Sequence, residues 1–409
     1  MQVPPIRLPS GVRDFLPRAA ARRRALAEAG LAVFEGWGYA RIITPAFECA
    51  DVLERGLGAD ARATAIRFVE PGTGEVVALR PDITPQIARV VATRMHEVPG
   101  PIRLCYEGAV TRLAAEGGQR EILQAGIELI DAGEPHGDAE VLAVAADALA
   151  AAQLPEVRLD VGHVAPARFV LDAAGEHRER LTGALARKDR AGLRAIARAL
   201  PEGIGPLAEA LGTLWGPAGP TLERALALPW PAWVVAALTQ LRTVIEVFHE
   251  LAGEAAPALT IDLGDLRGFD YYTGVRFAGY ATGAAESVLR GGRYDDLLAR
   301  YGRAARATGF AIDLESVAQA QRAAGLAPPA ARFAVAITGA GAPALARALR
   351  AAGLRAVTGS DAGADATLDL ERGAISRGAR AIDARDASGA IAAARVGQIQ
   401  PLVTLLQGG

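Results

Sequence analysis

The sequence predicts an α+β fold in two domains, and three features of the chain support this prediction. Its 409 residues exceed what one ordinary core holds, and 51% of them are apolar. Strand-rich segments lie on both sides of residues 170–255, which have a helical pattern almost throughout. Residues 331–409 alternate short apolar strands with an Ala/Leu-rich helix. We therefore expect residues 1–326 to form a sheet flanked by helices, with a helical insertion at about 170–255, followed by a small α/β domain at 331–409.

The N-terminal part predicts a helix, a strand, a hairpin and a second helix, in that order. Apolar residues near a 3.6-residue period predict a helix at 18–36, and residues 39–48 have the pattern of a strand that ends at Pro45. Residues 66–82 predict a hairpin with a glycine-containing turn. Thr84 is a suitable N-cap, and Pro85 a suitable first residue, for the helix that follows.

The later elements are predicted from the helical period of 3.6 residues and the strand period of 2 residues. Strands are predicted at residues 101–112, 121–131, 258–266 and 274–281, and a short Ala-rich helix at 136–152. The stretch "APPAAR" at 327–332 has the composition of a linker.

Charge and cysteine content exclude several classes of protein. The net charge is only −2, so the chain as a whole does not attract nucleic acid or an anionic membrane. No apolar run reaches the ~18 residues of a membrane span, and Met1 to Pro17 lacks the apolar core of a signal peptide. Cys49 and Cys105 form neither a disulfide framework nor a metal-binding spacing. We expect a protein of the reducing cytoplasm with no metal site.

Three segments concentrate polar side chains where a sheet would place apolar ones. They are "LRPDITPQ" (79–86), "TR…QREILQAGIE" (111–128) and "RGFDYYTG" (267–274). Gln124 and Glu128 lie four apart on one predicted strand and share a face. A carboxylate in an apolar strand needs a cation or several hydrogen-bond donors.

Together these segments have the chemistry of a pocket for a zwitterion. Asp82 and Glu128 would receive an ammonium or imidazolium group, and Arg112 and Arg267 would meet carboxylates. The alternatives are structural: Thr84 only caps a helix, and the tyrosine pair at 271–272 only packs. The common catalytic motifs are absent, including the phosphate-binding P-loop, the dinucleotide glycine fingerprint, the zinc helix and the nucleophile elbow.

The motifs resemble those of histidyl-tRNA synthetases and of the synthetase-like regulatory subunits of ATP phosphoribosyltransferase. "RGFDYYTG" resembles the Arg-Gly-Leu-Asp-Tyr-Tyr histidine signature, and "GGRYDDL" (291–297) resembles the second signature. The residues of "LRPDITPQIAR" are more similar to the corresponding segment of the regulatory subunits, and "SGVRDFLP" is similar to both groups. The resemblance covers about residues 6–320 and implies the class II aminoacyl-tRNA synthetase fold, an antiparallel sheet flanked by helices. It also implies a dimer formed through the segment around Pro45.

The resemblance implies a histidine-binding site at matching positions of this chain. Asp82 stands for the family glutamate that meets the α-amine, and Thr84 is the adjacent hydroxyl. The full implied set is Asp82, Thr84, Arg112, Gln124, Glu128, Arg267, Tyr271 and Tyr272.

Departures from the synthetase pattern fall on the nucleotide half of that site. The second class motif, Phe-Arg-x-Glu in the enzymes, has Ala114 in place of its glutamate, and the loop that follows is shorter and poorer in arginine. The third motif, Gly-Leu-Glu-Arg, has Ser316 in place of its arginine. Each lost charge-assisted contact costs about 1.5–3 kcal/mol, so ATP binding and adenylate formation should be strongly weakened.

The resemblance therefore implies a non-catalytic regulatory subunit. Such a chain pairs with a short catalytic subunit of ATP phosphoribosyltransferase, supports the first step of histidine biosynthesis and transmits feedback by L-histidine, with no cofactor of its own. The alternatives are an active histidyl-tRNA synthetase and a stand-alone histidine-binding module. Residues 331–409 hold nine arginines, six acids and one aromatic, Phe333, which does not favour recognition of tRNA.

Overall fold

The computed structural model describes residues 7–114, 118–253, 256–268, 271–328, 332–378 and 380–407. By its internal contacts the chain divides into two compact units, Met1–Pro328 and Pro329–Gly409. Among the described residues, no helix is long and apolar enough to cross a membrane.

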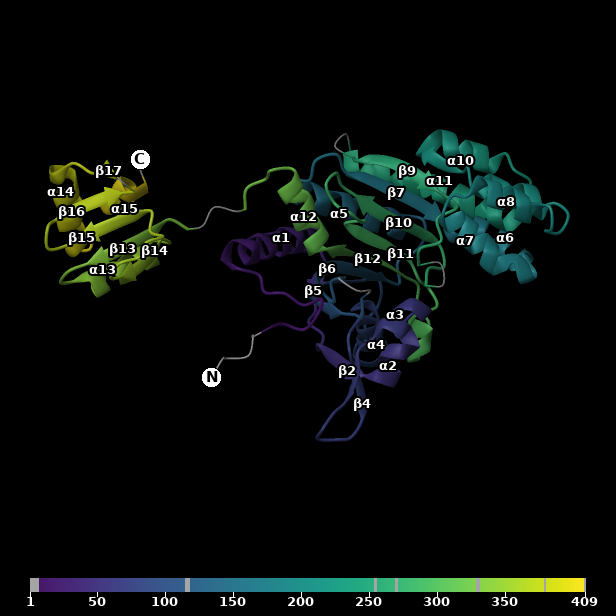
Figure 1. Cartoon of the computed structure of the whole chain (residues 1–409), viewed down its shortest axis with the longest axis horizontal. Helices are drawn as coiled ribbons and strands as arrows, with labels where there is room; N and C mark the ends of the chain where they lie inside the picture. Colours follow the sequence, from purple (N-terminus) through teal and green to yellow (C-terminus); the bar gives the residue numbers. More distant parts are fainter. Residues whose placement is uncertain are drawn as a thin grey trace. The chain divides into compact units, whose positions relative to one another are not determined.

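A nine-stranded sheet forms the centre of the first unit (Figure 1). In spatial order its strands are β1 (Ala40–Arg41), β5 (Ile102–Thr111), β6 (Glu121–Ile130), β12 (Ala307–Asp313), β11 (Leu289–Arg293), β10 (Val275–Tyr280), β7 (Arg158–His163), β9 (Ala258–Asp262) and β8 (Trp215–Pro217). Neighbouring strands are antiparallel except for the pairs β1–β5 and β7–β9, which are parallel. The prediction of an α+β fold built on a largely antiparallel sheet is confirmed.

Helices cover one face of this sheet, and the other face stays partly open. α1 (Pro17–Gly36), α5 (His136–Ala151) and α12 (Leu314–Ala323) pack on the covered face. Successive side chains of β5 point to opposite faces of the sheet. Cys105 belongs to the core under these helices. Its neighbour Tyr106 belongs to a second core on the other face, which includes α4 (Thr84–Arg94) and η3 (Leu298–Tyr301). α4 and η3 cover the second face only at one end, near β5, β6 and the end of β11.

The strand predicted at 39–48 ends before Pro45, as expected, but it is shorter than expected and the chain then enters a different sheet. Ala40–Arg41 is β1 of the large sheet, and Phe47–Cys49 is β2 of a separate three-stranded sheet with β4 (Val76–Leu79) and β3 (Arg67–Val69). Proline has no backbone N–H for a sheet, so Pro45 breaks the pairing between the two segments. The predicted hairpin corresponds to β3 and β4, which pair in antiparallel fashion. α2 (Ala50–Gly56) and α3 (Ala59–Thr64) complete this part of the unit.

The helical insertion contains one short strand in addition to its helices. The helices are α6 (Val164–Ala173), η1 (Gly175–His177), α7 (Arg178–Ala186), α8 (Arg190–Ala197), α9 (Ile204–Leu211), α10 (Ala218–Leu226) and α11 (Ala232–Ala252). Strand β8 lies within this block and pairs with β9, so the insertion extends the large sheet by an edge strand. Lys188, the one lysine of the chain, joins the α7–α8 turn to the sheet, since its Nζ lies 2.6 Å from both carboxylate oxygens of Asp262 at the end of β9.

His163 begins the insertion and gives the first unit a sensitivity to acid. Its Nδ1 accepts a hydrogen bond from the backbone N–H of Ala165 and so caps α6. Burial lowers the pKa of His163 to about 4, and the charges of nearby arginines act in the same direction. In the unfolded chain the imidazole of His163 is therefore protonated as the pH falls below 6.5, whereas in the folded chain it is protonated only near pH 4.

We expect the stability that neutral His163 contributes to be complete above pH 6.5 and to be lost as the pH falls toward 4. The full effect is roughly 3 kcal/mol. Urea unfolding at pH 7.5 and pH 5 should show a larger loss for the wild type than for His163→Asn, whose amide can cap the helix without titrating. Equal pH dependence of the two proteins would contradict the expectation.

The second unit is a small α/β domain with its own core. Its sheet has the order β14 (Arg355–Thr358), β13 (Ala334–Thr338), β15 (Ala366–Asp369), β16 (Ala374–Arg377) and β17 (Arg380–Ala381). The first three strands are parallel, β16 is antiparallel to its neighbour β15, and β17 is antiparallel to β16. α13 (Ala342–Ala351), α14 (Ala384–Arg395) and α15 (Gln400–Gln407) supply the remaining core residues.

Candidate functional site

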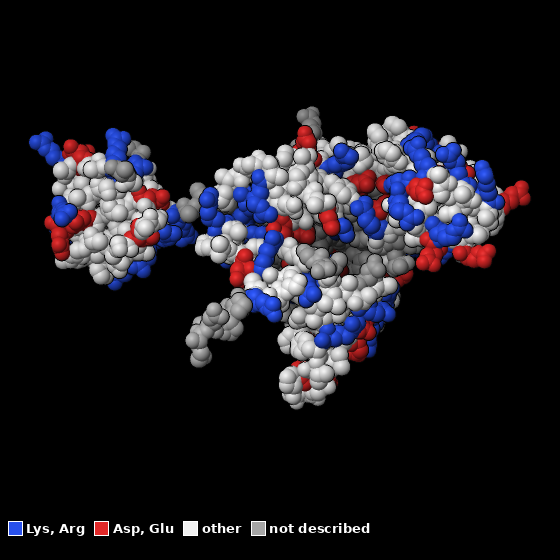
Figure 2. All heavy atoms as spheres, in the orientation of Figure 1, with Lys and Arg blue, Asp and Glu red and all other residues white. Residues whose placement is uncertain are grey.

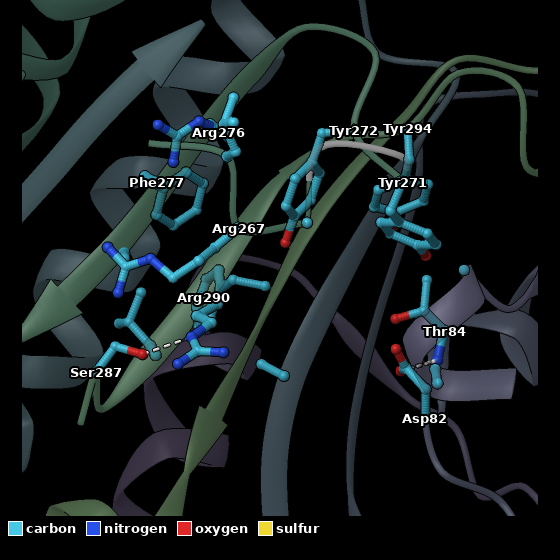
Figure 3. A pocket seen from close by; sticks show the side chains of 18 of the residues that line it. Asp82, Thr84, Arg267, Tyr271, Tyr272, Arg276, Phe277, Ser287, Arg290 and Tyr294 are labelled. Carbon is cyan, nitrogen blue, oxygen red and sulfur yellow. Dashed lines mark hydrogen bonds between the residues drawn. The ribbon is translucent and has the colours of Figure 1, made fainter. Parts of the chain in front are cut away.

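A cavity of about 610 Å³ lies against the partly open face of the large sheet. It falls within the range of ~300–1,000 Å³ that is usual for small-molecule sites. Its walls come from β6, β10, β11 and β12, from the segments before α4 and β10, and from α7 of the insertion. Figure 3 shows its two ends, with Asp82 and Thr84 at one and Arg267 and Arg290 at the other.

Seven of the eight site residues expected from the sequence line this cavity, and the eighth touches one of the seven. The seven are Asp82, Thr84, Arg112, Gln124, Arg267, Tyr271 and Tyr272. Glu128 lies beneath them, where the Thr84 hydroxyl donates a 2.5 Å hydrogen bond to its Oε1. Residues 269 and 270 of the predicted "RGFDYYTG" segment lie outside the described residues.

Thr84 has a different role from the one expected at the start of α4. The helix begins at Thr84 itself, and Ile83 occupies the N-cap position without a side-chain cap. Asp82 Oδ1 accepts from the Thr84 backbone N–H at 3.1 Å, so the carboxylate performs the local capping. The Thr84 hydroxyl is thereby left to bind Glu128, and the prediction that it acts as an N-cap is wrong.

Glu128 is a buried carboxyl group, and among the described residues no cationic side chain forms an ion pair with it. It is 1% exposed, and burial raises its pKa well above the usual range, with the charge of Asp82 adding to the effect. The backbone makes room for it through Gly309 on the neighbouring strand, where a Cβ atom would lie 2.2 Å from Glu128 Oε2. A ligand with a positive charge or a strong hydrogen-bond donor would give the buried carboxyl group the partner it needs.

Three tyrosines close the same end of the cavity. The rings of Tyr271 and Tyr272 lie 5.4 Å apart, edge to face, and those of Tyr271 and Tyr294 lie 5.2 Å apart. Gly268 has a positive φ of +72°, and a Cβ there would lie 2.7 Å from the Tyr272 ring, so only glycine allows this ring position. Burial raises the pKa of Tyr271 well above its usual value, so its hydroxyl stays protonated.

Several buried polar atoms around the cavity lack a hydrogen-bond partner within the described part of the chain. They are Glu128 Oε2, Gln124 Oε1, the hydroxyls of Tyr271 and Tyr294, and Arg112 Nε. Buried polar atoms in native proteins are almost always paired, so a group of unpaired ones around one space indicates a missing ligand. Two acceptors and a guanidinium fit a small molecule with both positive and negative groups.

Arg267 meets a carboxylate other than the ones expected. Its Nε and Nη2 donate to Asp265 at 2.8–3.1 Å, and Arg276 Nη1 donates to the same carboxylate at 2.8 Å. Burial alone would raise the pKa of Asp265, but the hydrogen bonds from Arg267 and the charge of Arg276 outweigh it and hold the pKa well below its usual value. Arg267 therefore remains at the cavity wall, where its side chain binds Asp265, and among the described residues no hydrogen bond or ion pair joins it to Glu128.

Further polar residues line the cavity that the sequence motifs did not assign to the site. Among them are Arg178, Arg276, Ser287, Arg290 and Tyr294. Arg276 interrupts the otherwise apolar strand "GVRFAGYA", which was an available signal, because a charge in a central strand requires a partner. Arg290 and Ser287 carried no such signal.

A network of buried ion pairs joins the C-terminal end of β11 to the start of α5. Arg293 is 0% exposed, and its guanidinium contacts Asp138 at 3.0 Å, Glu134 at 2.8 Å and Asp295 at 3.1 Å. Burial raises the pKa of Asp138 to about 6 despite the arginine charge beside it. The arginine of "GGRYDDL" thus supports the strand that carries Arg290 and does not line the cavity itself.

Ser316, which stands in place of the third-motif arginine, is the third residue of α12. Its backbone N–H donates to the N-capping Asp313, so only a short hydroxyl extends from this position. The preceding Glu315 is occupied by Arg13 and Arg23, both in direct ion-pair contact with it. Among the described residues, no group of three or more His, Cys, Asp and Glu side chains is placed to hold a metal ion.

Comparison with known proteins gives one consistent family. The model of the family described as "Histidyl-tRNA synthetase" matches residues 11–317. A relative from an Anaeromyxobacter species, named "ATP phosphoribosyltransferase regulatory subunit", is 47% identical over 333 residues, which span 80% of this chain and 96% of the relative. A protein of the same name from Geobacter sulfurreducens is 41% identical over 314 residues, which span 75% of this chain and 71% of the relative.

Solved structures agree with the observed fold. The "ATP phosphoribosyltransferase regulatory subunit/histidyl-tRNA synthetase" from Bacillus halodurans has a TM-score of 0.77 at 29% identity, and the match covers 89% of this chain and 95% of that one. Histidyl-tRNA synthetase from a Nostoc species has a TM-score of 0.76 at 19% identity, over 95% of this chain and 99% of that one, which supports the fold alone. The chain therefore belongs to the histidyl-tRNA synthetase-like family, together with its ATP phosphoribosyltransferase regulatory subunits.

Proposed function

We propose that this chain is the non-catalytic regulatory subunit of an ATP phosphoribosyltransferase. In this role it pairs with a short catalytic subunit, supports the joining of ATP and phosphoribosyl pyrophosphate, and makes that step sensitive to L-histidine. The observation that carries the proposal is a cavity whose amino-acid end is complete in residue types, while Ser316 replaces the arginine expected at the nucleotide end. The names of relatives at 47% and 41% identity support the same role.

The histidine site of the proposal uses the cavity end around Glu128. Asp82 and Thr84 would receive the α-amine, and Glu128 with the tyrosines would hold the imidazole ring. Arg112 and Arg267 would meet the carboxylate end. The unpaired atoms support this orientation, because the acceptors Glu128 Oε2 and Gln124 Oε1 would each gain a donor from the ligand, and Arg112 Nε would gain a carboxylate acceptor.

Feedback requires that histidine prefer one state of the assembly. A coupling of about 1–3 kcal/mol, roughly 5- to 150-fold in affinity, is sufficient for regulation. The coupling is reciprocal, so the inhibited assembly must bind histidine more tightly than the active one by the same factor.

The test is to mix the purified chain with a short catalytic subunit from the same source. We expect transferase activity to depend on this chain, and added histidine to lower the activity of the mixture. Activity that neither needs the chain nor gains histidine sensitivity from it would refute the proposal.

An active histidyl-tRNA synthetase is the second candidate, and Arg112, Arg267 and Arg120 favour it. Histidine-dependent exchange of pyrophosphate into ATP would establish that activity and refute a purely regulatory role. We expect no such exchange, because Ala114 and Ser316 remove two contacts to ATP. A stand-alone histidine-binding module would bind histidine but leave the transferase unchanged in the mixing experiment.

We also propose that the chain forms a dimer through the three-stranded sheet and the segment that leads to it. Large apolar side chains are exposed there, with Ile43 82%, Val69 61%, Val76 51% and Phe47 47% exposed. Figure 2 shows few charged side chains on this projecting hairpin. Apolar surface of this kind on a folded domain is typical of an interface.

Binding of tRNA is not part of the proposal, and two free cysteines are consistent with action in the cytoplasm.

Phe47→Asp should convert the dimer to monomers, because it places a charge in an interface that would otherwise bury an aromatic ring. Sedimentation velocity at micromolar concentration would show the change. Val396→Asp is the matched control, since Val396 is 77% exposed but lies in the second unit. A wild-type chain that sediments as a monomer would refute the proposed dimer.

A further inference from the structure

Residues 178–198 of the helical insertion carry an excess of positive charge. They include seven basic and two acidic residues, a net charge of +5 in a chain whose total is −2. Arg178 pairs with Asp172, and Lys188 pairs with Asp262. The other five arginines of the segment are exposed, and among the described residues none of them forms an ion pair: Arg180, Arg187, Arg190, Arg194 and Arg198. Their charge therefore faces water.

Three of these arginines form a row along α8, which we call the arginine stripe. Arg190 is the first residue of the helix, Arg194 follows one turn later, and Arg198 is the C-cap residue with helical backbone angles. Residues four apart lie on one side of a helix, about 6 Å from each other along its axis. Figure 2 shows several Lys and Arg side chains over the part of the insertion where Figure 1 labels α8.

The helix that carries the stripe is firmly anchored. Asp189 Oδ1 accepts a hydrogen bond from the backbone N–H of Gly192 at 2.9 Å and caps the N-terminus of α8. On the other side of the helix Leu193 and Ile196 are buried. A Cβ atom at Gly212, just after α9, would lie 2.4 Å from Leu193 Cδ1, so the two helices pack closely. The arginines therefore project from a fixed backbone.

The stripe is unfavourable for the chain alone. Like charges four residues apart repel each other and destabilise a helix. Arg190 also lies in the first turn, where the helix dipole favours acidic side chains over basic ones. An anionic partner would remove both disadvantages, because its charges would lie against the stripe.

The narrow shape of the stripe fits a single acidic helix. Carboxylates four residues apart on a partner helix would have the spacing of the arginines, and guanidinium groups bind carboxylates in pairs. A nucleic-acid duplex would bring its phosphates close to the exposed Glu176 and Glu179 as well, and these charges would repel it. Residues 178–198 also contain no aromatic side chain on which the bases of a single strand could stack.

We propose that the arginine stripe is a docking surface for an acidic helix of a protein partner. The inference rests on the proposed function only for the identity of that partner, which is then the catalytic subunit. Exposed charges raise the rate of association more than the final affinity, and salt screens them. The stripe thus guides the partner to the insertion.

The experiment measures the rate of association between the full chain and a short catalytic subunit from the same source. At about 50 mM NaCl we expect Arg190→Gln/Arg194→Gln to slow association about tenfold, and at about 500 mM the difference should fall below about twofold. The matched control is Arg347→Gln/Arg350→Gln, which removes the same charge from exposed positions of α13 in the second unit. Urea unfolding should show the stripe variant to be as stable as the wild type or more stable.

Two results of this experiment would overturn the inference and leave the proposed function intact. One is an unchanged association rate of the stripe variant at low salt. The other is an equally slow association of the control variant, which would mean that only the total charge matters.

A second measurement decides the inference if the catalytic subunit does not bind the chain, a result that refutes the proposed function. A helical peptide with glutamate at every fourth position and a short RNA duplex are titrated separately into the full chain at low salt. We expect the peptide to bind and the stripe variant to bind it more weakly. No binding of the peptide at millimolar concentration would overturn the inference. So would tighter binding of the duplex that the same substitutions weaken, because the stripe would then belong to a nucleic-acid site.

Discussion

Replacing Arg293 with methionine should destabilise the first unit by about 3–5 kcal/mol. The side chain is fully buried and contacts three carboxylates, of which Asp138 is itself 2% exposed. Methionine fills a similar volume but leaves these acids without a counter-charge. Since domains are stable by only ~5–15 kcal/mol, the loss would be a large part of the total.

Urea unfolding followed by circular dichroism measures this loss. Arg242→Met is the control, because the exposed Arg242–Glu223 pair should contribute less than about 1 kcal/mol. If Arg293→Met does not fold, Arg293→Lys keeps the charge and should show a smaller loss than methionine. A change below 1 kcal/mol for Arg293→Met would mean that the network does not support the fold.

Replacing Glu128 with glutamine should lower histidine affinity by on the order of 100-fold and leave the free chain equally stable or more stable. The amide has the shape of the acid but cannot provide a negative charge for a cationic ligand. Because burial raises the pKa of Glu128, the folded chain holds a proton that the unfolded chain releases above about pH 4.5. The acid therefore costs stability at neutral pH, and glutamine removes that cost.

Calorimetry with histidine and urea unfolding of the same sample separate the two effects. Glu107→Gln is the control, because Glu107 lies on the adjacent strand but pairs with the exposed Arg41. In the assembly, Glu128→Ala and Tyr272→Ala should abolish feedback while support of the catalytic subunit largely remains. Loss of stability in parallel with loss of binding would assign Glu128 a structural role.

Secondary structure followed from the sequence wherever one periodicity held over a whole element. α1 is such an element, because its apolar residues recur near a period of 3.6. The β3–β4 hairpin was instead marked by the glycines of its turn. The end of the first strand at Pro45 was expected, but the placement of Phe47–Cys49 in a different sheet was not, because only the tertiary structure assigns strands to sheets. β8 was missed because three residues at a sheet edge have too little pattern to detect.

The site was predictable in its residue types but not in its pairings. Thr84 has the composition of an N-cap, and its bond to Glu128 joins residues 44 positions apart, which no local rule reveals. Arg267 was expected to meet a carboxylate distant in sequence or that of a ligand, whereas it forms a bidentate pair with Asp265, two residues away on the cavity wall. Arg290 belongs to a glycine-rich strand, and its place at the cavity follows only from the order of strands in the sheet.

The single lysine offers a way to observe this molecule without altering its sequence. Apart from the amino terminus, Lys188 is the only primary amine available to an acylating dye, and its side chain is 38% exposed. Its partner Asp262 also accepts from Arg276 through its backbone carbonyl, and Arg276 in turn holds Asp265 beside Arg267. A fluorophore on that amine would lie two contacts from Arg276, a residue of the cavity wall, and we expect its emission to report when the cavity is filled.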